Sequence, residues 1–289
     1  MSVRIKRSAP RSAIPHVDVY GQDHSPWVQA VLLGLHEKDV SHTLTTVPPL
    51  SVFRKWGVMM PAASVDGGPW HKESADLLRQ LGYGTVSQDE LRAINDAWRG
   101  VTHRAKSATR FFHAASLIHD LHPSGLRRLR NQFLRSFAVL YFYVLLLYVI
   151  RTGLQPDPEN FAGQFLYWEQ RLEKSAGAYL GGDEPNTLDM MLFGVIQCHC
   201  SIPVPPLDAL QVESGLSRMR SWIATMQQRF TGYRHLYSGV YFEPHSPRPD
   251  QSRGFERAAY WVGLTFMIIA FPLTIPLIIF LASRLPRAS

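Results

Sequence analysis

The sequence predicts an α/β domain, then an all-helical domain, then a single transmembrane helix close to the C-terminal end. Extended and helical patterns alternate within residues 17–47, in the order of a β-α-β unit. From residue 88 onward nearly every stretch has helical periodicity. Residues 258–283 carry no charged side chain. At about 1.5 Å of rise per residue, a helix over this run is longer than the roughly 30 Å hydrocarbon core of a bilayer.

The β-α-β unit begins with an alternating apolar segment, 17–20 (VDVY). A turn follows, and Ser25 and Pro26 then begin a helix, because serine is a favourable N-cap and proline suits the first helical position. A second extended segment at 41–47 completes the unit. The chain then passes through a loop rich in Pro and Trp. A short amphipathic helix is predicted at 73–81.

One stretch of the helical domain is apolar on every side. Residues 136–150 contain no charge, and as a helix they reach roughly 22 Å, short of a bilayer core. We therefore expect a buried helix of the second domain. A helix that contacts the membrane or a partner is the alternative, because a run that is apolar all round has no polar face for water. A further helix is expected over 159–180, and 243–252 has the composition of a linker.

The net charge of +7 comes from basic residues that are spread along the chain. A nucleic-acid partner would require a basic face joined to a binding motif, and the sequence has no such motif, so we expect no nucleic acid. Attraction to anionic lipid headgroups explains the charge of a membrane-bound protein more simply. Residues 1–14 are expected to form a basic arm.

The expected location is a membrane, with one pass at 258–283. The first residues lack an apolar core of the signal-peptide type, so we expect the soluble body to face the cytoplasm. Pro272 and Pro276 are expected to kink the transmembrane helix.

Cys198 and Cys200 lie on either side of a histidine, but three successive side chains diverge and no second ligand pair lies at zinc spacing. We therefore expect no metal site.

Four local motifs follow one another along the chain, and none is decisive alone. They are His24-Ser25-Pro26-Trp27, Met60-Pro61, Glu73-Ser74 and the capping box from Asn186 to Asp189. In this order and at these distances they resemble the cytosolic glutathione transferase superfamily, over roughly residues 15–240. The resemblance implies a thioredoxin-like domain at 15–84 and an all-α domain at 88–240. A linker at 241–257 would then lead to the transmembrane helix.

The first two motifs imply the sulfur end of a glutathione site. Ser25 matches the residue that activates glutathione in the family, and a hydroxyl at a helix N-terminus can donate to a thiolate. Met60 precedes Pro61, whose peptide bond is cis in the family, and the backbone of the preceding residue pairs with the cysteinyl part of glutathione. Methionine departs from the usual valine here, but the contact is made through backbone atoms.

The third motif implies the other end of the glutathione site. In the family an acidic residue binds the γ-glutamyl ammonium and the serine after it binds the γ-glutamyl carboxylate. Glu73 and Ser74 match these two positions. Asn186 and Asp189 match the capping box of the core helix in the second domain, which concerns the fold and not the chemistry. Candidates to line a substrate cleft between the domains are Trp27, Trp98, His103 and Arg104.

The resemblance implies an enzyme with glutathione as its co-substrate. It would transfer the glutathione thiolate to an apolar small-molecule electrophile in or near the lipid bilayer. Tail-anchored relatives such as the ganglioside-induced differentiation-associated proteins supply the alternative, a non-catalytic interaction or scaffold protein of the same fold. Ser25, Glu73 and Ser74 favour the enzyme, and the apolar stretch 136–150 favours the interaction protein. A second copy of the chain and a membrane protein are the candidate protein partners.

Overall fold

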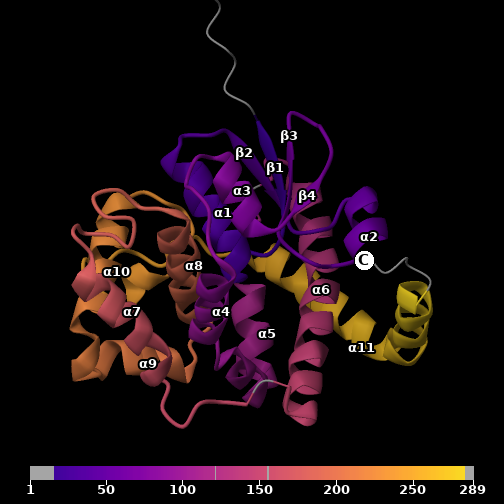
Figure 1. Ribbon diagram of the computed structural model, residues 1–289. Helices are drawn as coiled ribbons and strands as arrows, with labels where there is room; N and C mark the ends of the chain where they lie inside the picture. The colour runs from indigo at the N-terminus through magenta and orange to yellow at the C-terminus, as the bar shows by residue number, and fades with distance from the viewer. Residues whose placement is uncertain (1–15, 121, 155, 284–289) are drawn as a thin grey trace, which may run out of the picture.

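Four short strands form one mixed sheet at the top of the molecule as drawn in Figure 1. The computed structural model describes residues 16–120, 122–154 and 156–283. The strands are β1 (Val17–Tyr20), β2 (His42–Thr45), β3 (Ala62–Val65) and β4 (His71–Lys72), in the order β2-β1-β3-β4. Strand β1 is parallel to β2 and antiparallel to β3, and β3 is antiparallel to β4. This is a thioredoxin-like sheet, as the sequence predicts.

Three helices accompany the sheet: α1 (Pro26–Glu37), α2 (Leu50–Trp56) and α3 (Ser74–Gln80). The predicted β-α-β unit is confirmed, because β1, α1 and β2 occupy the expected places. Helix α1 is buried along most of its length. Helix α2 and strand β4 were not predicted, since α2 lies in the segment rich in Pro and Trp and β4 has two residues.

The rest of the described chain is helical. Its α-helices are α4 (Gln88–Ala97), α5 (Ala108–Ser116), α6 (Gly125–Thr152), α7 (Gly163–Lys174), α8 (Thr187–Ser201), α9 (Pro205–Val212), α10 (Ser217–Arg229) and α11 (Gly254–Ser283). Short 3-10 turns occupy Val101–Lys106, Ser214–Leu216 and Ser238–Val240. The all-α second domain that the sequence predicts is therefore present.

Helix α8 forms the centre of the helical domain and joins it to α1. Its predicted capping box is confirmed: the Asn186 side chain accepts from the N–H groups of Leu188 and Asp189, and the Asp189 carboxylate accepts from Asn186 N at 3.0 Å. A Cβ at Gly194 would lie 2.4 Å from the carbonyl oxygen of Pro26. Only a glycine lets α8 approach the first turn of α1 so closely.

The apolar stretch 136–150 corrects one prediction. It belongs to α6, which has 28 residues and is only partly buried along its C-terminal half: Leu146 is buried there, but Tyr148 is 57% exposed. The helix is also long enough to cross a bilayer, because it begins eleven residues before the uncharged run, at Gly125. The sequence prediction of a short buried helix was wrong because burial depends on the neighbours of a helix, and an apolar run does not specify them.

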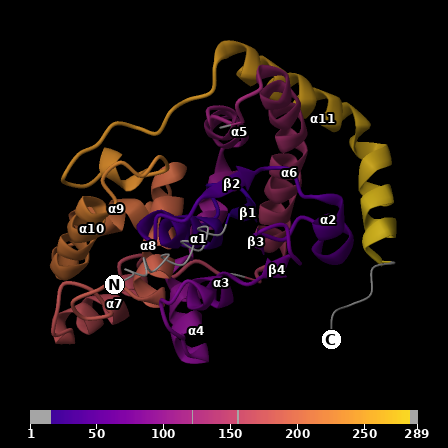
Figure 2. The ribbon, with the colours of Figure 1, turned by 90° about the horizontal axis from the view of Figure 1, so that it is seen from above.

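The C-terminal helix α11 packs along α6 and then bends away from it (Figures 1 and 2). Pro272 and Pro276 lie within it, and the ribbon shows two arms that meet at an angle, which agrees with the predicted kink. By length and composition, α6 and the segment Gly254–Thr274 of α11 are both candidate membrane spans. The predicted basic arm at 1–14 lies outside the described residues.

Candidate functional site

A cavity of about 670 Å³ opens between the two domains. It brings together five of the predicted site residues: Trp27, Met60, Pro61, Glu73 and Ser74. The helical domain closes the opposite wall, with Leu91, Arg92 and Asn95 from α4 and Met191 from α8. Segments more than a hundred residues apart in sequence thus converge on one space.

The peptide bond between Met60 and Pro61 is cis, as the resemblance implies. It lies directly before β3, at the edge of the cavity. The thioether Sδ of Met60 accepts a hydrogen bond from the backbone N–H of Gln22, at 3.2 Å. This contact joins the cis-proline element to the loop between β1 and α1, and Pro61 itself is buried.

Glu73 has a backbone conformation that L-residues seldom adopt, with φ of 81° and ψ of 108°. Such conformations cluster at functional sites and persist only where the surrounding structure holds them. The Glu73 carboxylate pairs with Lys72 Nζ at 3.1 Å, and its side chain is 65% exposed. Ser74 follows as the first residue of α3 and is buried. The turn therefore presents a carboxylate and a hydroxyl at neighbouring positions of the cavity wall.

Sequence reasoning missed three cationic residues that line the same cavity: Lys72, Arg79 and Arg92. Against the acidic lining residues Glu73 and Asp76, they give the lining of the cavity as a whole an excess of one positive charge. Lys72 could have been found from its place directly before the Glu73-Ser74 motif. Arg79 and Arg92 lie on helices among other charged residues, and nothing in their local sequence sets them apart.

Ser25 lies at the N-cap of α1 in extended backbone conformation, as predicted. Its backbone N–H donates to Gln22 O at 2.9 Å, and its carbonyl accepts from Gln29 N at 2.9 Å. Within the described part of the chain, its hydroxyl makes no capping hydrogen bond. Ser25 is also not among the described residues that line the cavity. The structure thus places it near Trp27 but leaves its hydroxyl outside the cavity wall.

A buried polar cluster fixes the loop before Ser25. The carboxylate of Asp23 accepts a hydrogen bond from the Tyr237 hydroxyl at 2.7 Å and lies 3.1 Å from His235 Nδ1. Burial would raise the pKa of Asp23, but the bond to His235, the nearby imidazoles and the Tyr237 hydroxyl lower it overall, below its usual value. Burial lowers the pKa of His24 to about 3, although Asp23 opposes this shift. The loop is therefore tied to the segment after α10.

The other candidate cleft residues lie elsewhere. The Trp98 ring meets Trp27 edge-on, with centroids 5.9 Å apart, and its Nε1 donates to Cys198 Sγ at 3.4 Å. His103 Nε2 lies 2.6 Å from Asp157 Oδ2. Arg104 is buried and donates to the carbonyl oxygen of Cys198 on α8. Of the four, only Trp27 is found among the described residues that line the cavity.

The Cys-His-Cys string lies inside α8. Both cysteines are buried and free, and burial raises the pKa of the Cys200 thiol well above its usual value. His199 is also buried, with Nε2 2.9 Å from the carbonyl oxygen of Ala97. Across residues 16–283, leaving out 121 and 155, no group of three or more His, Cys, Asp or Glu side chains is arranged to hold a metal ion.

Comparison with known proteins gives structural similarity without sequence similarity. No protein-family model matches the sequence, and no curated protein does. Among solved structures, the chain is similar to poplar glutathione transferase F1, with 17% identity, a TM-score of 0.43, and coverage of 76% of this chain and 96% of that one. A delta-class glutathione transferase from Nilaparvata lugens gives 16% identity, a TM-score of 0.41, and coverage of 87% and 99%.

A glutathione transferase from Methylococcus capsulatus gives 15% identity and a TM-score of 0.40, with coverage of 86% of this chain and 98% of that one. At such identities and TM-scores these similarities carry no conclusion about activity. The thioredoxin-like fold rests on the strand order and on the helical second domain of this chain itself.

Proposed function

We propose that this protein binds glutathione in the cavity between its domains and transfers the glutathione thiolate to an apolar electrophile at a membrane. The observation that carries the proposal is the convergence of Met60, Glu73 and Ser74 on one cavity, with Glu73 held at a positive φ. These residues were predicted from separate motifs, and the fold brings them together.

The charges of the cavity suit the ligand. Glutathione has two carboxylates and one ammonium group. In the proposed complex the ammonium lies at the Glu73 carboxylate and the γ-glutamyl carboxylate at the Ser74 hydroxyl, while the backbone of Met60 pairs with the cysteinyl part. Lys72 and Arg79 supply cationic groups on the wall that carries Glu73 and Ser74, and Arg92 supplies one on the opposite wall, so one of the three can meet the glycyl carboxylate.

In this proposal Ser25 donates a hydrogen bond to the thiolate, and α11 keeps the enzyme near lipophilic electrophiles. A hydrogen bond to an anion that develops in a partly dehydrated site lowers the pKa of the thiol. For this to happen the Ser25 hydroxyl must turn toward the cavity when glutathione binds.

A second candidate function is that of a non-catalytic interaction protein of the same fold at a membrane. The specific observation in its favour is the position of Ser25, whose hydroxyl is not part of the cavity wall that the described residues form. In this case the cavity would bind a ligand, or keep only its structural role, without activating a thiol.

Substitution of Ser74 tests the binding site. Ser74→Ala removes a hydrogen bond to a charged carboxylate, which costs about 1.5–3 kcal/mol and weakens glutathione binding roughly ten- to a hundredfold. Calorimetric titration of the full-length protein in detergent micelles measures this change. Ser214→Ala is the matched control, because Ser214 is exposed and lies outside the described lining of the cavity. Equal affinity in the Ser74 variant and the control would remove Ser74 from the site.

Substitution of Ser25 separates the two candidate functions. If the hydroxyl stabilises the thiolate, Ser25→Ala raises the pKa of bound glutathione and lowers turnover near neutral pH, while binding changes little. Ultraviolet titration of the thiolate in the two proteins measures the shift. A wild-type protein that binds glutathione without lowering its thiol pKa would make the interaction protein the better account.

A further inference from the structure

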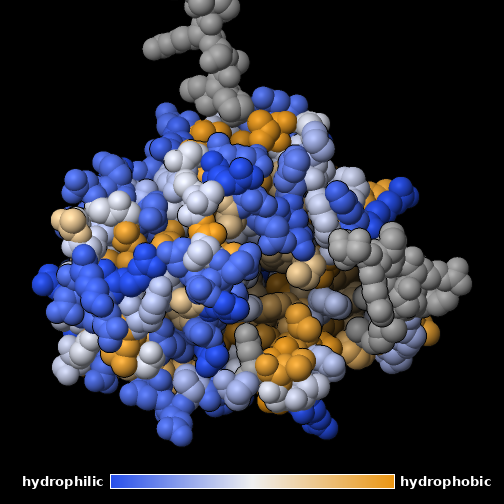
Figure 3. Space-filling model, in the orientation of Figure 1, coloured by the Kyte–Doolittle hydropathy of each residue, from blue (hydrophilic) through white to orange (hydrophobic). Residues whose placement is uncertain are grey.

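The C-terminal half of α6 exposes large apolar side chains that the globular body leaves uncovered. Figure 3 shows an apolar patch over the lower end of this helix. The exposed fractions range from 38 to 57% for Tyr141, Leu145, Leu147, Tyr148 and Ile150. Residues 136–150 contain no charge, so this surface offers water almost nothing to solvate beyond two tyrosine hydroxyls.

These side chains do not share one face of the helix. At about 100° per residue, Tyr141, Leu145 and Tyr148 form one stripe, and Leu147 and Ile150 lie on roughly the opposite side. A partner protein with a flat surface covers one side of a helix and leaves the other in water. The hydrocarbon of a bilayer surrounds an inserted helix and covers both stripes at once.

Helix α11 lies beside α6 and continues the apolar surface. Phe266 packs on Phe133 and Phe137 of α6, with ring centroids 6.2 and 6.3 Å apart. A Cβ at Gly263 would lie 2.6 Å from the carbonyl oxygen of Phe133, so the two backbones are in close contact there. Small residues at such crossings are typical of helix pairs in membranes. Among the described side chains of α11, Val262, Ile268, Ile269 and Leu273 are large, apolar and exposed, and Phe266 is partly exposed beside α6.

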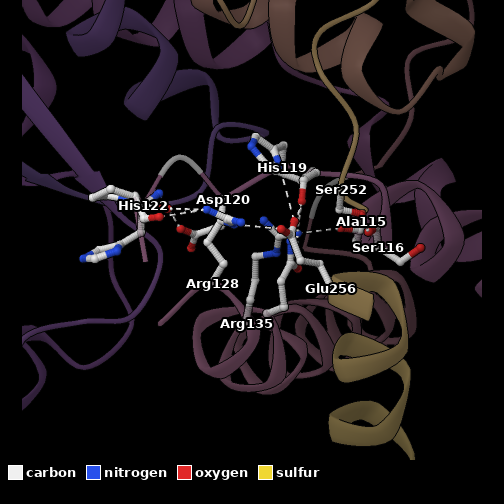
Figure 4. A network of polar contacts seen from close by, with 12 residues as sticks. Ala115, Ser116, His119, Asp120, His122, Arg128, Arg135, Ser252 and Glu256 are labelled. Carbon is white, nitrogen blue, oxygen red and sulfur yellow. Dashed lines mark hydrogen bonds and ion pairs between the residues drawn. The ribbon is translucent and has the colours of Figure 1, made fainter. Parts of the chain in front are cut away.

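A buried polar network fixes the two helices at their N-terminal ends (Figure 4). The Glu256 carboxylate of α11 is 2.8 Å from Arg128 Nε of α6 and 3.2 Å from His119 Nδ1. Ser252 Oγ donates to Ser116 O at 2.6 Å. Because Arg128 meets Glu256 and Phe137 meets Phe266, α6 and α11 run in the same direction from this network.

The N-terminal end of the helix pair is basic, and α6 then carries no charge from Ser136 to Ile150, before the exposed Arg151 in its last turn. Arg127, Arg130 and Arg253 are exposed beside the network, at the depth where anionic lipid headgroups would lie. The chain after α6 returns to the body through α7, where Gln164 Nε2 donates to the carbonyl oxygen of Ala97 at 2.8 Å. The end of α6 therefore stays on the same side of the membrane as the body.

We propose that the C-terminal half of α6 dips into the lipid leaflet that α11 enters, without crossing the bilayer. The partner of this surface is the hydrocarbon of a lipid bilayer, and the protein is held by two helices packed together instead of one flexible tail. The proposal rests on the membrane location within the proposed function and is independent of glutathione binding.

Fluorescent labels at single introduced cysteines test this arrangement in the full-length protein. Tyr148→Cys and Ile150→Cys report the two stripes of α6, and Ile269→Cys reports α11. Val212→Cys is the matched control, because Val212 is apolar and 80% exposed and belongs to α9, which lies apart from α6 in Figures 1 and 2. Unsubstituted protein gives the background, since Cys198 and Cys200 are buried. The labelled proteins are placed in vesicles of phosphatidylcholine with a minor fraction of phosphatidylglycerol.

Brominated phosphatidylcholine quenches labels that lie in lipid, and iodide quenches labels that lie in water. We expect labels at 148, 150 and 269 to lose emission with brominated lipid and to be protected from iodide, and the label at 212 to behave in the opposite way. Iodide quenching at 148 and 150, with lipid quenching at 269, overturns the proposal and leaves the α11 anchor. Protection from both quenchers at 148 and 150 also overturns it, because a second copy or another protein then covers α6. Absence of lipid quenching at 269 overturns it together with the membrane location, and leaves glutathione binding untouched.

Discussion

Helices α8 and α6 both contain about fifteen residues of predominantly apolar character, yet they have different environments. Helix α8 is buried on all sides, and a capping box closes its first turn. Helix α6 buries only part of its length, and among the described residues its N-cap Ser124 makes no side-chain capping bond. The difference is that α8 makes buried contacts along its whole length, whereas the C-terminal half of α6 packs on the body with one side and leaves large apolar side chains exposed.

The largest expected effect comes from Asp189. Its carboxylate accepts from the backbone N–H groups of Leu180, Gly181 and Asn186 and from Trp222 Nε1, at distances of 2.8–3.0 Å. Asp189→Ala leaves these buried donors without a charged acceptor, so we expect it to cost more than about 3 kcal/mol of unfolding free energy. Urea unfolding in detergent micelles, followed by far-ultraviolet circular dichroism, measures the loss.

Ser124→Ala at the start of α6 is the matched control. Because its hydroxyl makes no capping bond with the described residues, we expect a change within about 0.5 kcal/mol. Equal losses in the Asp189 and Ser124 variants would show that apolar burial alone distinguishes α8 from α6.

An intermediate effect is expected from pH, through His199 on α8. Burial lowers the pKa of His199 to about 4. Between pH 6.5 and 4 its imidazole therefore stays neutral in the folded protein, whereas the same imidazole in the unfolded chain takes up a proton. Stability that is present above pH 6.5 is therefore lost as the pH falls toward 4. The loss is at most about 3 to 4 kcal/mol, at about 1.4 kcal/mol per pH unit for one proton.

His199→Gln keeps a donor for the carbonyl oxygen of Ala97 but binds no proton. We expect this variant to have a shallower dependence of unfolding free energy on pH between 4 and 6.5. A remaining slope is expected from His24, whose pKa is also lowered by burial. An unchanged slope in the variant would mean that His199 is not the group that titrates.

The smallest effects compare two glycines at helix crossings. An alanine Cβ would lie 2.4 Å from Pro26 O at Gly194 and 2.6 Å from Phe133 O at Gly263, so both substitutions force helices apart. We expect Gly194→Ala to cost about 1–3 kcal/mol, and Gly263→Ala less, because detergent or lipid can fill the space beside α11. Gly163→Ala on α7 is the control, since nothing in the described structure lies within 4 Å of its added Cβ. A larger loss at Gly263 than at Gly194 would reverse the comparison.

The sequence specified the parts of the fold that depend on local patterns. The alternation in β1, the start of α1 at Ser25 and Pro26, and the capping box at Asn186 are all read from neighbouring residues. The exposure of α6 could not be predicted in the same way. An apolar sequence does not distinguish a helix surrounded by protein from one surrounded by lipid. The packing of α6 on α11 also brings together residues 128 positions apart in the sequence, which no local pattern indicates.

The candidate site shows the same division. Met60, Pro61, Glu73 and Ser74 were predicted from motifs, and they share a cavity. Whether Ser25 faces that cavity depends on the course of the loop before α1, which the buried cluster around Asp23 determines. The partners of Asp23 come from the segment after α10, more than two hundred residues away, and no local pattern indicates that contact.

The contact between Arg128 and Glu256 has a consequence for the order in which the protein is made. Translation proceeds at about 5–20 residues per second, so the ribosome needs roughly 6 to 26 seconds to add the 128 residues that separate these two positions. During that interval α6 exists without α11, and the residues that Gly263 and Phe266 will cover have no neighbour on that side. The surface of α6 that packs on α11 is therefore completed only after α11 has been synthesised, well after the body around α6 has formed.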